Sequence, residues 1–153
     1  MLAESGCGLI ICEESIKIIA PSVLLGVKNI QTQPYPGFPT DMQPQMMACL
    51  CTAHGESSIT ENIFENRFKI VPELIRMGAD ISVSGSKALL SGSAKLHGEA
   101  VAARDLRGGA ALVAAGLAAE GTTIVQESEY IDRGYVDVCS DLRSLGACID
   151  RRQ

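Results

Sequence analysis

The segment from Asp41 to Ile81, DMQPQMMACLCTAHGESSITENIFENRFKIVPELIRMGADI, contains an order of local signals that recurs further along the chain. An aspartate precedes an apolar helical stretch that ends at a glycine, and a short β-branched run follows. An arginine and a second helix ending at a glycine come next. The segment from Asp105 to Ile149 shows the same order, offset by 64 to 68 residues. Such a period indicates one supersecondary unit present twice.

Each unit combines helix and strand signals in the order β-α-β-α-β-β. Helices are predicted where Ala, Leu and Met dominate or where a short segment ends at a glycine: 46–53, 71–78, 110–117 and 140–146. Strands are predicted in β-branched and apolar runs, the last two forming a closing hairpin: 58–60, 122–125, 81–83 and 88–90. The predicted fold class is therefore α/β, built from repeats.

The first residues read as the end of a further repeat. Residues 2–6 match the helix end at 74–78, and the apolar runs that follow match the closing hairpin. We therefore expect the chain to open in mid-repeat. The predicted division is the end of one repeat at 1–30, a full repeat at 31–97 and an incomplete last repeat at 98–153.

Composition and charge exclude several classes of protein. Asp and Glu outnumber Lys and Arg by 18 to 13, giving a net charge of −5, which argues against nucleic-acid and anionic-membrane partners. The longest apolar runs, 8–12 and 110–119, are too short to cross a bilayer. The first residues lack the positive region of a secretory signal. The sequence predicts a soluble, cytoplasmic protein.

Neither metal ligation nor disulfide bonding is indicated by the cysteines and histidines. The cysteines lie in apolar stretches without Cys-x-x-Cys pairs, and neither His54 nor His97 lies near a cluster of them. No metal site is predicted. Buried, reduced thiols are predicted at all six cysteines: Cys7, Cys12, Cys49, Cys51, Cys139 and Cys148.

The proline-rich loop before the first helix is suited to aiming one side chain. Three prolines and a glycine restrict the backbone of residues 34–39, and Asp41 follows at the helix start. Asp41 is a candidate catalytic carboxylate, although the spacing alone favours an N-cap. Asp105 occupies the same place in the second unit, and the same two interpretations apply to it.

Arginines also recur at matching positions. Arg67 and Arg133 each follow the first inner strand of their unit, where they would emerge at the edge of the sheet. An exposed ion pair with an acidic neighbour is the alternative to a binding role, with Glu65 for Arg67 and Asp132 for Arg133.

Arg107 is harder to explain as a surface residue. It lies near a helix start, where a positive charge opposes the helix dipole, and Gly108-Gly109 adds backbone amides there. Two carboxylates and three arginines, without a convincing nucleophile, suit a polyanionic ligand and proton transfer. This pattern alone names neither a substrate nor a reaction.

Five motifs occur in order along nearly the whole chain: PYPGFPTDMQ (34–43), ITENIFENRF (59–68), RMGAD (76–80), DLR (105–107) and IDRGY (131–135). Together they resemble the UDP-N-acetylglucosamine 1-carboxyvinyltransferases, a family of the EPSP synthase superfamily. The sister 5-enolpyruvylshikimate-3-phosphate synthases share the repeat architecture but match these motifs less well.

The resemblance implies transfer of an enolpyruvyl group from phosphoenolpyruvate to the 3-hydroxyl of UDP-N-acetylglucosamine, without a cofactor. This reaction belongs to peptidoglycan precursor synthesis, on which cell wall, cell shape and cell division depend. The resemblance also implies that Asp41 contacts the sugar hydroxyl as candidate base, that the backbone of Ile63 contacts the nucleotide sugar, and that Arg133 binds phosphoenolpyruvate. Three other matched positions line the same cleft: Arg67, Asp105 and Arg107. Among these, Asp105 is the second catalytic candidate and Arg107 is the favoured anion contact.

The family's fold consists of two domains, each an inside-out α/β barrel of three repeats, which close on the substrates. The chain is expected to supply about two of the six repeats and to lack the family's loop cysteine and its Lys-Asn pair. We therefore expect it to be inactive alone and to need the remainder of the enzyme as partner. The alternative is a non-catalytic module that binds nucleotide sugars or associates with another protein.

Overall fold

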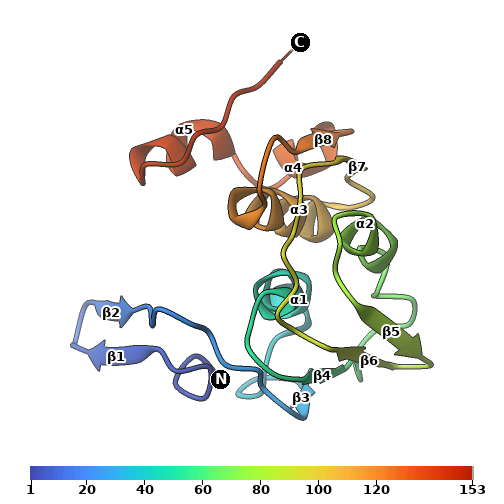
Figure 1. Ribbon diagram of the computed structural model, residues 1–153. Helices are drawn as coiled ribbons and strands as arrows, with labels where there is room; N and C mark the ends of the chain where they lie inside the picture. Colours follow the sequence, from blue (N-terminus) through green and yellow to red (C-terminus); the bar gives the residue numbers. More distant parts are fainter. Residues whose placement is uncertain (153) are drawn as a thin grey trace.

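A four-stranded sheet lies at the base of the molecule (Figure 1). The structure is a computed structural model that describes residues 1–152. Strand β3 (Ile30–Gln31) pairs in parallel with β4 (Ser57–Thr60). The hairpin of β5 (Ile81–Ser84) and β6 (Lys87–Leu90) adds two antiparallel strands, giving the order β3-β4-β6-β5. The predicted closing hairpin is confirmed.

Two central helices pack against each other between this sheet and a smaller one (Figure 1). They are α1 (Gln43–Cys51), which follows the 3-10 turn η1 (Thr40–Met42), and α3 (Leu106–Ala118). The smaller sheet pairs β7 (Ala100–Ala102) in parallel with β8 (Ile124–Gln126). Three short helices complete the chain: α2 (Val71–Arg76), α4 (Glu129–Asp132) and α5 (Val138–Ser144).

The order β3-α1-β4-α2-β5-β6 is the β-α-β-α-β-β order predicted from the sequence. The elements β7, α3, β8 and α5 follow the first part of that order, with α4 as an addition that the sequence did not predict. Helix α3 begins at Leu106, earlier than predicted, and includes Gly108 and Gly109 because the side chain of Asp105 caps its first turn. The three sheets form no closed barrel within residues 1–152.

The main hydrophobic core lies where the helices meet the large sheet. Its fully buried members include Met47 of α1, Leu74 of α2 and Leu112 of α3, together with Ile59 of β4. Burying a side chain of this size stabilises a fold by about 1.5 to 3 kcal/mol. A smaller cluster joins Ile131 of α4 to Val113 of α3 and to Ala103, which follows β7. Helices from both units therefore share one core, which holds them in a defined relative position.

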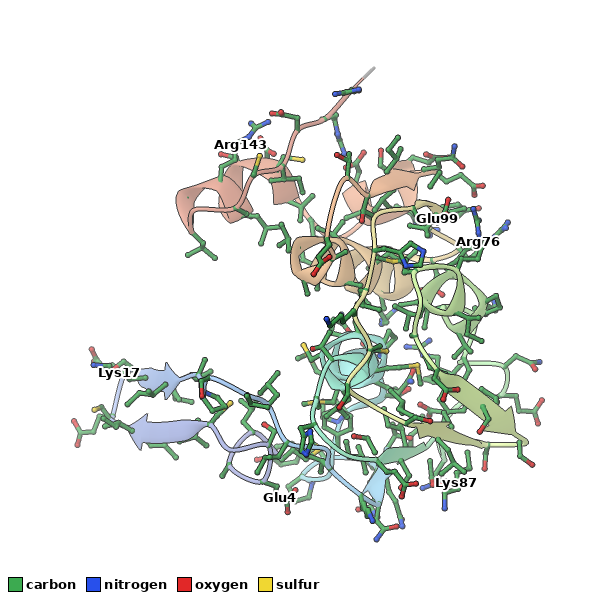
Figure 2. All side chains as sticks on the ribbon, in the orientation of Figure 1. Glu4, Lys17, Arg76, Lys87, Glu99 and Arg143 are labelled. Atoms are coloured by element: carbon green, nitrogen blue, oxygen red, sulfur yellow. The ribbon has the colours of Figure 1, made fainter. Side chains whose placement is uncertain are left out.

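The N-terminal hairpin of β1 (Gly8–Ile11) and β2 (Ile16–Ile19) extends away from this core. Figure 2 shows Lys17 at its far end, remote from the helices. All eight strand residues are exposed, including Ile11 at 74% and Ile16 at 65%. This apolar hairpin therefore has no packing partner within the described part of the chain.

The prediction of buried thiols is correct for two cysteines and wrong for four. Cys7 and Cys51 are buried, whereas Cys139 is half-buried and three others are exposed: Cys12, Cys49 and Cys148. The apolar neighbours of Cys12 lie in the uncovered hairpin, so local hydrophobicity did not lead to burial there. All six are free, and residues 1–152 contain no group of acidic, histidine and cysteine side chains able to hold a metal ion.

No helix among residues 1–152 has both the length and the apolar character needed to cross a membrane. The longest, α3, has 13 residues.

Candidate functional site

The carboxylate of Asp41 is held by two arginines that come from different parts of the chain. Asp41 lies in η1, where the proline-rich loop meets α1. Arg67 reaches it from the loop after β4, with Nη2 at 2.8 Å from Oδ1. Arg107 reaches it from the first turn of α3, with Nε at 2.5 Å from Oδ1 and Nη2 at 2.8 Å from Oδ2. Both units of the fold therefore contribute to this cluster.

The arginines keep Asp41 ionised. The hydrogen bond from Arg107 is the main reason that the pKa of Asp41 lies below its ordinary value, and the charges of both arginines act in the same direction. Partial burial opposes them without cancelling the effect. The same bond raises the pKa of Arg107. The site thus presents a carboxylate flanked by two cations, which is suited to a ligand with both hydroxyl and anionic groups.

The two aspartates that occupy matching positions in the sequence have different roles in the structure. The N-cap interpretation is wrong for Asp41, because Met42 occupies the N-cap position of α1 and no side chain caps that helix. It is correct for Asp105, whose Oδ1 accepts a hydrogen bond of 2.8 Å from the backbone N–H of Gly108. The cap positions the first turn of α3, and with it Arg107.

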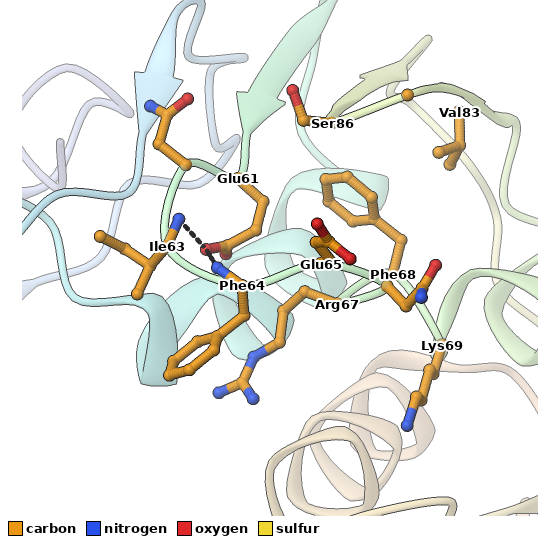
Figure 3. Close-up of a pocket in the computed structure, with 12 residues that line it drawn as sticks. Glu61, Ile63, Phe64, Glu65, Arg67, Phe68, Lys69, Val83 and Ser86 are labelled. Atoms are coloured by element: carbon orange, nitrogen blue, oxygen red, sulfur yellow. Dashed lines mark hydrogen bonds between the residues drawn. The ribbon is translucent and has the colours of Figure 1, made fainter.

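A hollow of about 740 Å³ lies beside Arg67 (Figure 3). The loop of residues 61–69 forms one side, and Val83, Gly85 and Ser86 of the β5–β6 hairpin form the other. The guanidinium of Arg67 lies 5.2 Å from the centre of the Phe64 ring. Its Nε is buried and has no hydrogen-bond partner within residues 1–152. Ile63 also lines the hollow, so two predicted site residues meet there.

Sequence reasoning missed Glu61, although its carboxylate is the best-connected polar group of this region. The residue is only 4% exposed. Its oxygens accept hydrogen bonds from the hydroxyls of Thr32 and Thr40 and from the backbone N–H groups of Ile63 and Phe64, at 2.8 to 3.1 Å. A glutamate directly after a buried β-branched strand was the available signal. It points to a buried acceptor because a charged residue there must be hydrogen-bonded.

The exposed ion pairs proposed as alternatives do not form as predicted. Arg67 pairs with Asp41 and not with Glu65. Asp132 pairs with Arg151 and not with Arg133.

Arg133 lies outside the cluster around Asp41. It is the C-cap of α4 and is exposed. Within residues 1–152 its guanidinium forms no ion pair or side-chain hydrogen bond, so the structure leaves it accessible to a ligand.

Residues 1–142 match the family described as EPSP synthase (3-phosphoshikimate 1-carboxyvinyltransferase). The chain belongs to this family. Curated proteins that are similar to the chain carry a more specific name. The UDP-N-acetylglucosamine 1-carboxyvinyltransferase 2 of Caldanaerobacter subterraneus subsp. tengcongensis is 53% identical over 150 residues, which are 98% of this chain and 36% of that protein. The corresponding enzyme of Desulfofundulus thermocisternus is also 53% identical, over 98% of this chain and 61% of its own length.

Solved structures of an enolpyruvyl transferase and of an EPSP synthase agree with the fold. The enolpyruvyl transferase NikO from Streptomyces tendae superposes with a TM-score of 0.87 at 29% identity, over 97% of this chain and 34% of that chain. An EPSP synthase from Acinetobacter baumannii, at 17% identity and a TM-score of 0.59, shares the fold. The chain spans 36% to 61% of the length of the two curated relatives.

Proposed function

We propose that this chain is the C-terminal portion of an enzyme that transfers the enolpyruvyl group from phosphoenolpyruvate to the 3-hydroxyl of UDP-N-acetylglucosamine. The reaction would serve peptidoglycan precursor synthesis in the cytoplasm, and hence cell shape and division. One observation carries the proposal: an ionised Asp41 is bound by Arg67 and Arg107, and Arg67 also lines a hollow large enough for part of a nucleotide sugar. The names of the curated relatives support the choice of substrates.

Asp41 is proposed to act on the sugar hydroxyl. As a carboxylate it accepts a hydrogen bond from the hydroxyl and orients it toward the second substrate. While both arginines bind it, its lowered pKa makes it a weak base. An anionic substrate that draws one arginine away would raise that pKa and favour proton transfer to Asp41. The arginine pair therefore couples arrival of the anion to activation of the carboxylate.

The other candidate residues have separate proposed roles. Arg67 lines the hollow with a partly exposed side chain that can meet a ligand oxygen, and the backbone of Ile63 contacts the nucleotide sugar. Arg133 binds phosphoenolpyruvate through its exposed guanidinium. Asp105 remains the second catalytic candidate. Its Oδ1 already caps α3, which leaves Oδ2 for a ligand.

The remainder of the longer enzyme is the proposed partner. We propose that residues 1–30, 31–97 and 98–153 belong to three repeats of one inside-out barrel, and that a second domain closes over the site. The uncovered apolar hairpin supports this, because exposed patches of this kind mark association surfaces. The isolated chain is proposed to be inactive, because losing a general acid alone reduces rates by about 10² to 10⁴-fold.

Binding of UDP-N-acetylglucosamine to the purified chain tests the site. Calorimetry, or an NMR titration if the affinity is millimolar, should show binding by the wild type and by the control Asp80→Asn, which changes an exposed aspartate. Asp41→Asn should weaken it by about tenfold. Binding that is absent, or equal in all three, contradicts the proposed substrate site.

The exposed hairpin also favours a second candidate, a non-catalytic protein-association module. Phosphate release from phosphoenolpyruvate separates the two functions. The chain alone should release none, and adding the missing residues of a curated relative as a separate polypeptide should restore release that Asp41→Asn abolishes. Stable association without any restored turnover favours the module.

A further inference from the structure

The carboxylate of Glu61 joins three segments that meet at the candidate site. One hydrogen bond of 2.8 Å comes from Thr32, at the end of β3. Another of 2.9 Å comes from Thr40, the residue before Asp41. The backbone N–H groups of Ile63 and Phe64, at 2.9 and 3.1 Å, begin the loop that lines the hollow. Glu61 thus joins its own loop to two segments that lie 21 and 29 positions earlier in the sequence.

Glu61 is itself held firmly. Its backbone N–H donates to the carbonyl of Ser86 at 2.8 Å, which ties it to the β5–β6 turn. Thr32 is fully buried, and its hydroxyl also accepts a hydrogen bond of 2.8 Å from the N–H of Asn62. A buried carboxylate that accepts several hydrogen bonds is rigid, because every alternative position leaves a charge unsatisfied.

Both partners of the Arg67–Asp41 ion pair lie within three residues, along the sequence, of groups that donate hydrogen bonds to Glu61. Asp41 directly follows Thr40, and Arg67 lies three residues after Phe64 in the same loop. Their 2.8 Å contact therefore depends on how Glu61 places the two segments relative to each other. Figure 3 shows the carboxylate of Glu61 directed toward the N–H groups of Ile63 and Phe64, while Arg67 lies further along the same loop.

We propose that Glu61 is the positioning residue of the nucleotide-sugar site. Although it belongs to the loop that lines the hollow, its carboxylate is occupied by four protein donors, so it acts through the segments that it holds. It holds the Asp41 segment and the hollow-lining loop in the relative position that lets both bind one ligand. This inference rests on the proposed function for the identity of the ligand, but the geometry that it assigns to Glu61 does not.

Glu73 provides a matched control. It is the other buried glutamate, 7% exposed, and it also accepts a backbone hydrogen bond, from Ala102 at 3.3 Å. It pairs with Arg76 and Arg104 on the side of α2 that faces β7, so its network does not include Asp41 or the hollow. A general effect of losing a buried carboxylate should appear in both residues, whereas positioning of the site belongs to Glu61 alone.

The test compares Glu61→Leu, Glu61→Gln and Glu73→Leu in the full chain, by affinity for UDP-N-acetylglucosamine and by NMR of the Asp41 and Arg67 backbone amides. In Glu61→Leu we expect shifted signals, faster amide exchange and a Kd raised about tenfold or more. Glu61→Gln should rescue both readouts, because its amide oxygen still accepts and its NH₂ group can donate to Thr40. Glu73→Leu should lower the unfolding temperature and leave both readouts at wild-type values.

Folded Glu61→Leu with wild-type amide signals and Kd overturns the proposal, as does an equal loss of affinity in Glu73→Leu. If Glu61→Leu does not fold, Thr40→Val replaces it, since that change removes only one donor to Glu61. It should shift the Asp41 amide and weaken binding in the same direction, and an unchanged Asp41 signal overturns the proposal. If the wild type binds no UDP-N-acetylglucosamine, the substrate assignment fails, and the amide signals still decide the role of Glu61.

Discussion

The contact between Asp41 and Arg107 links the two units of the fold, and a double-mutant cycle should detect it. The cycle compares the wild type with Asp41→Asn, Arg107→Gln and the double variant. The side chain of Asp41 is 53% exposed and that of Arg107 is 36% exposed, so water screens much of the attraction between the two charges. Exposed pairs contribute about 0.2 to 1 kcal/mol, and the bidentate geometry places this one at the upper end. We expect a coupling free energy of about 1 kcal/mol at low ionic strength.

The coupling should disappear in acid. The folded-state pKa of Asp41 lies below its ordinary value, so the pair stabilises the folded chain fully above the unfolded-state value of about 3.9. This stabilisation is lost as the pH falls through the lower folded-state pKa, because the carboxylate is then protonated in both states. Added salt should reduce the coupling without abolishing it.

Urea unfolding of the four proteins, followed by circular dichroism, measures the coupling at about pH 7 and again at about pH 2 to 3. A parallel cycle on Lys28 and Glu56 is the control. Those groups lie 3.7 Å apart and are 69% and 78% exposed, so we expect a coupling close to zero. An Asp41–Arg107 coupling no larger than the control, or one that persists unchanged in acid, would show that this ion pair does not stabilise the contact between the two units.

Three further predictions follow from the cap, the packing and the thiols. Asp105→Ala should lower the free energy of unfolding in urea by about 1 kcal/mol, because α3 loses its N-cap, and Asp105→Ser should restore most of it. Gly109→Ala should cost about 1 to 3 kcal/mol in the same assay, because its new Cβ would lie 2.7 Å from Cγ1 of Ile131. Burial raises the pKa of the Cys51 thiol to about 12. At about pH 8 a thiol reagent should therefore modify exposed Cys12 and leave Cys51 unmodified until the chain unfolds. Rapid modification of Cys51 in the folded chain would contradict this prediction.

Most secondary structure could be predicted because local rules control it. The β5–β6 hairpin forms around Gly85, whose φ of +57° suits a tight turn, and α2 begins with a proline within its first turn. The elements that were missed lack such local signals. Strand β7 is only Ala100–Ala102, and its parallel pairing with β8 across α3 is a long-range contact.

The candidate site could be predicted only in part, because matching sequence positions acquired different partners. Asp41 and Asp105 have the same local pattern, yet one caps a helix and the other binds two arginines. Spacing could not show that Arg107 lies beside an aspartate 66 positions away. Glu61 had no role in the sequence interpretation, because two of its four donors, Thr32 and Thr40, become its neighbours only when the chain after β3 and η1 pack against the end of β4.

The repeated unit, the order of helices and strands, the family and the identity of five candidate polar residues could all be predicted from the sequence. These properties depend on periodicity, capping and motif order, which are local signals that can be recognised within each repeat. Which charges meet, which thiols are covered and which carboxylate is buried became known from the three-dimensional fold. Packing of α1 against α3 brings Arg107 to Asp41, and the absence of a covering layer over the hairpin in residues 1–152 leaves apolar residues exposed. Such contacts join distant segments, so their energies depend on the assembled fold and not on the local sequence.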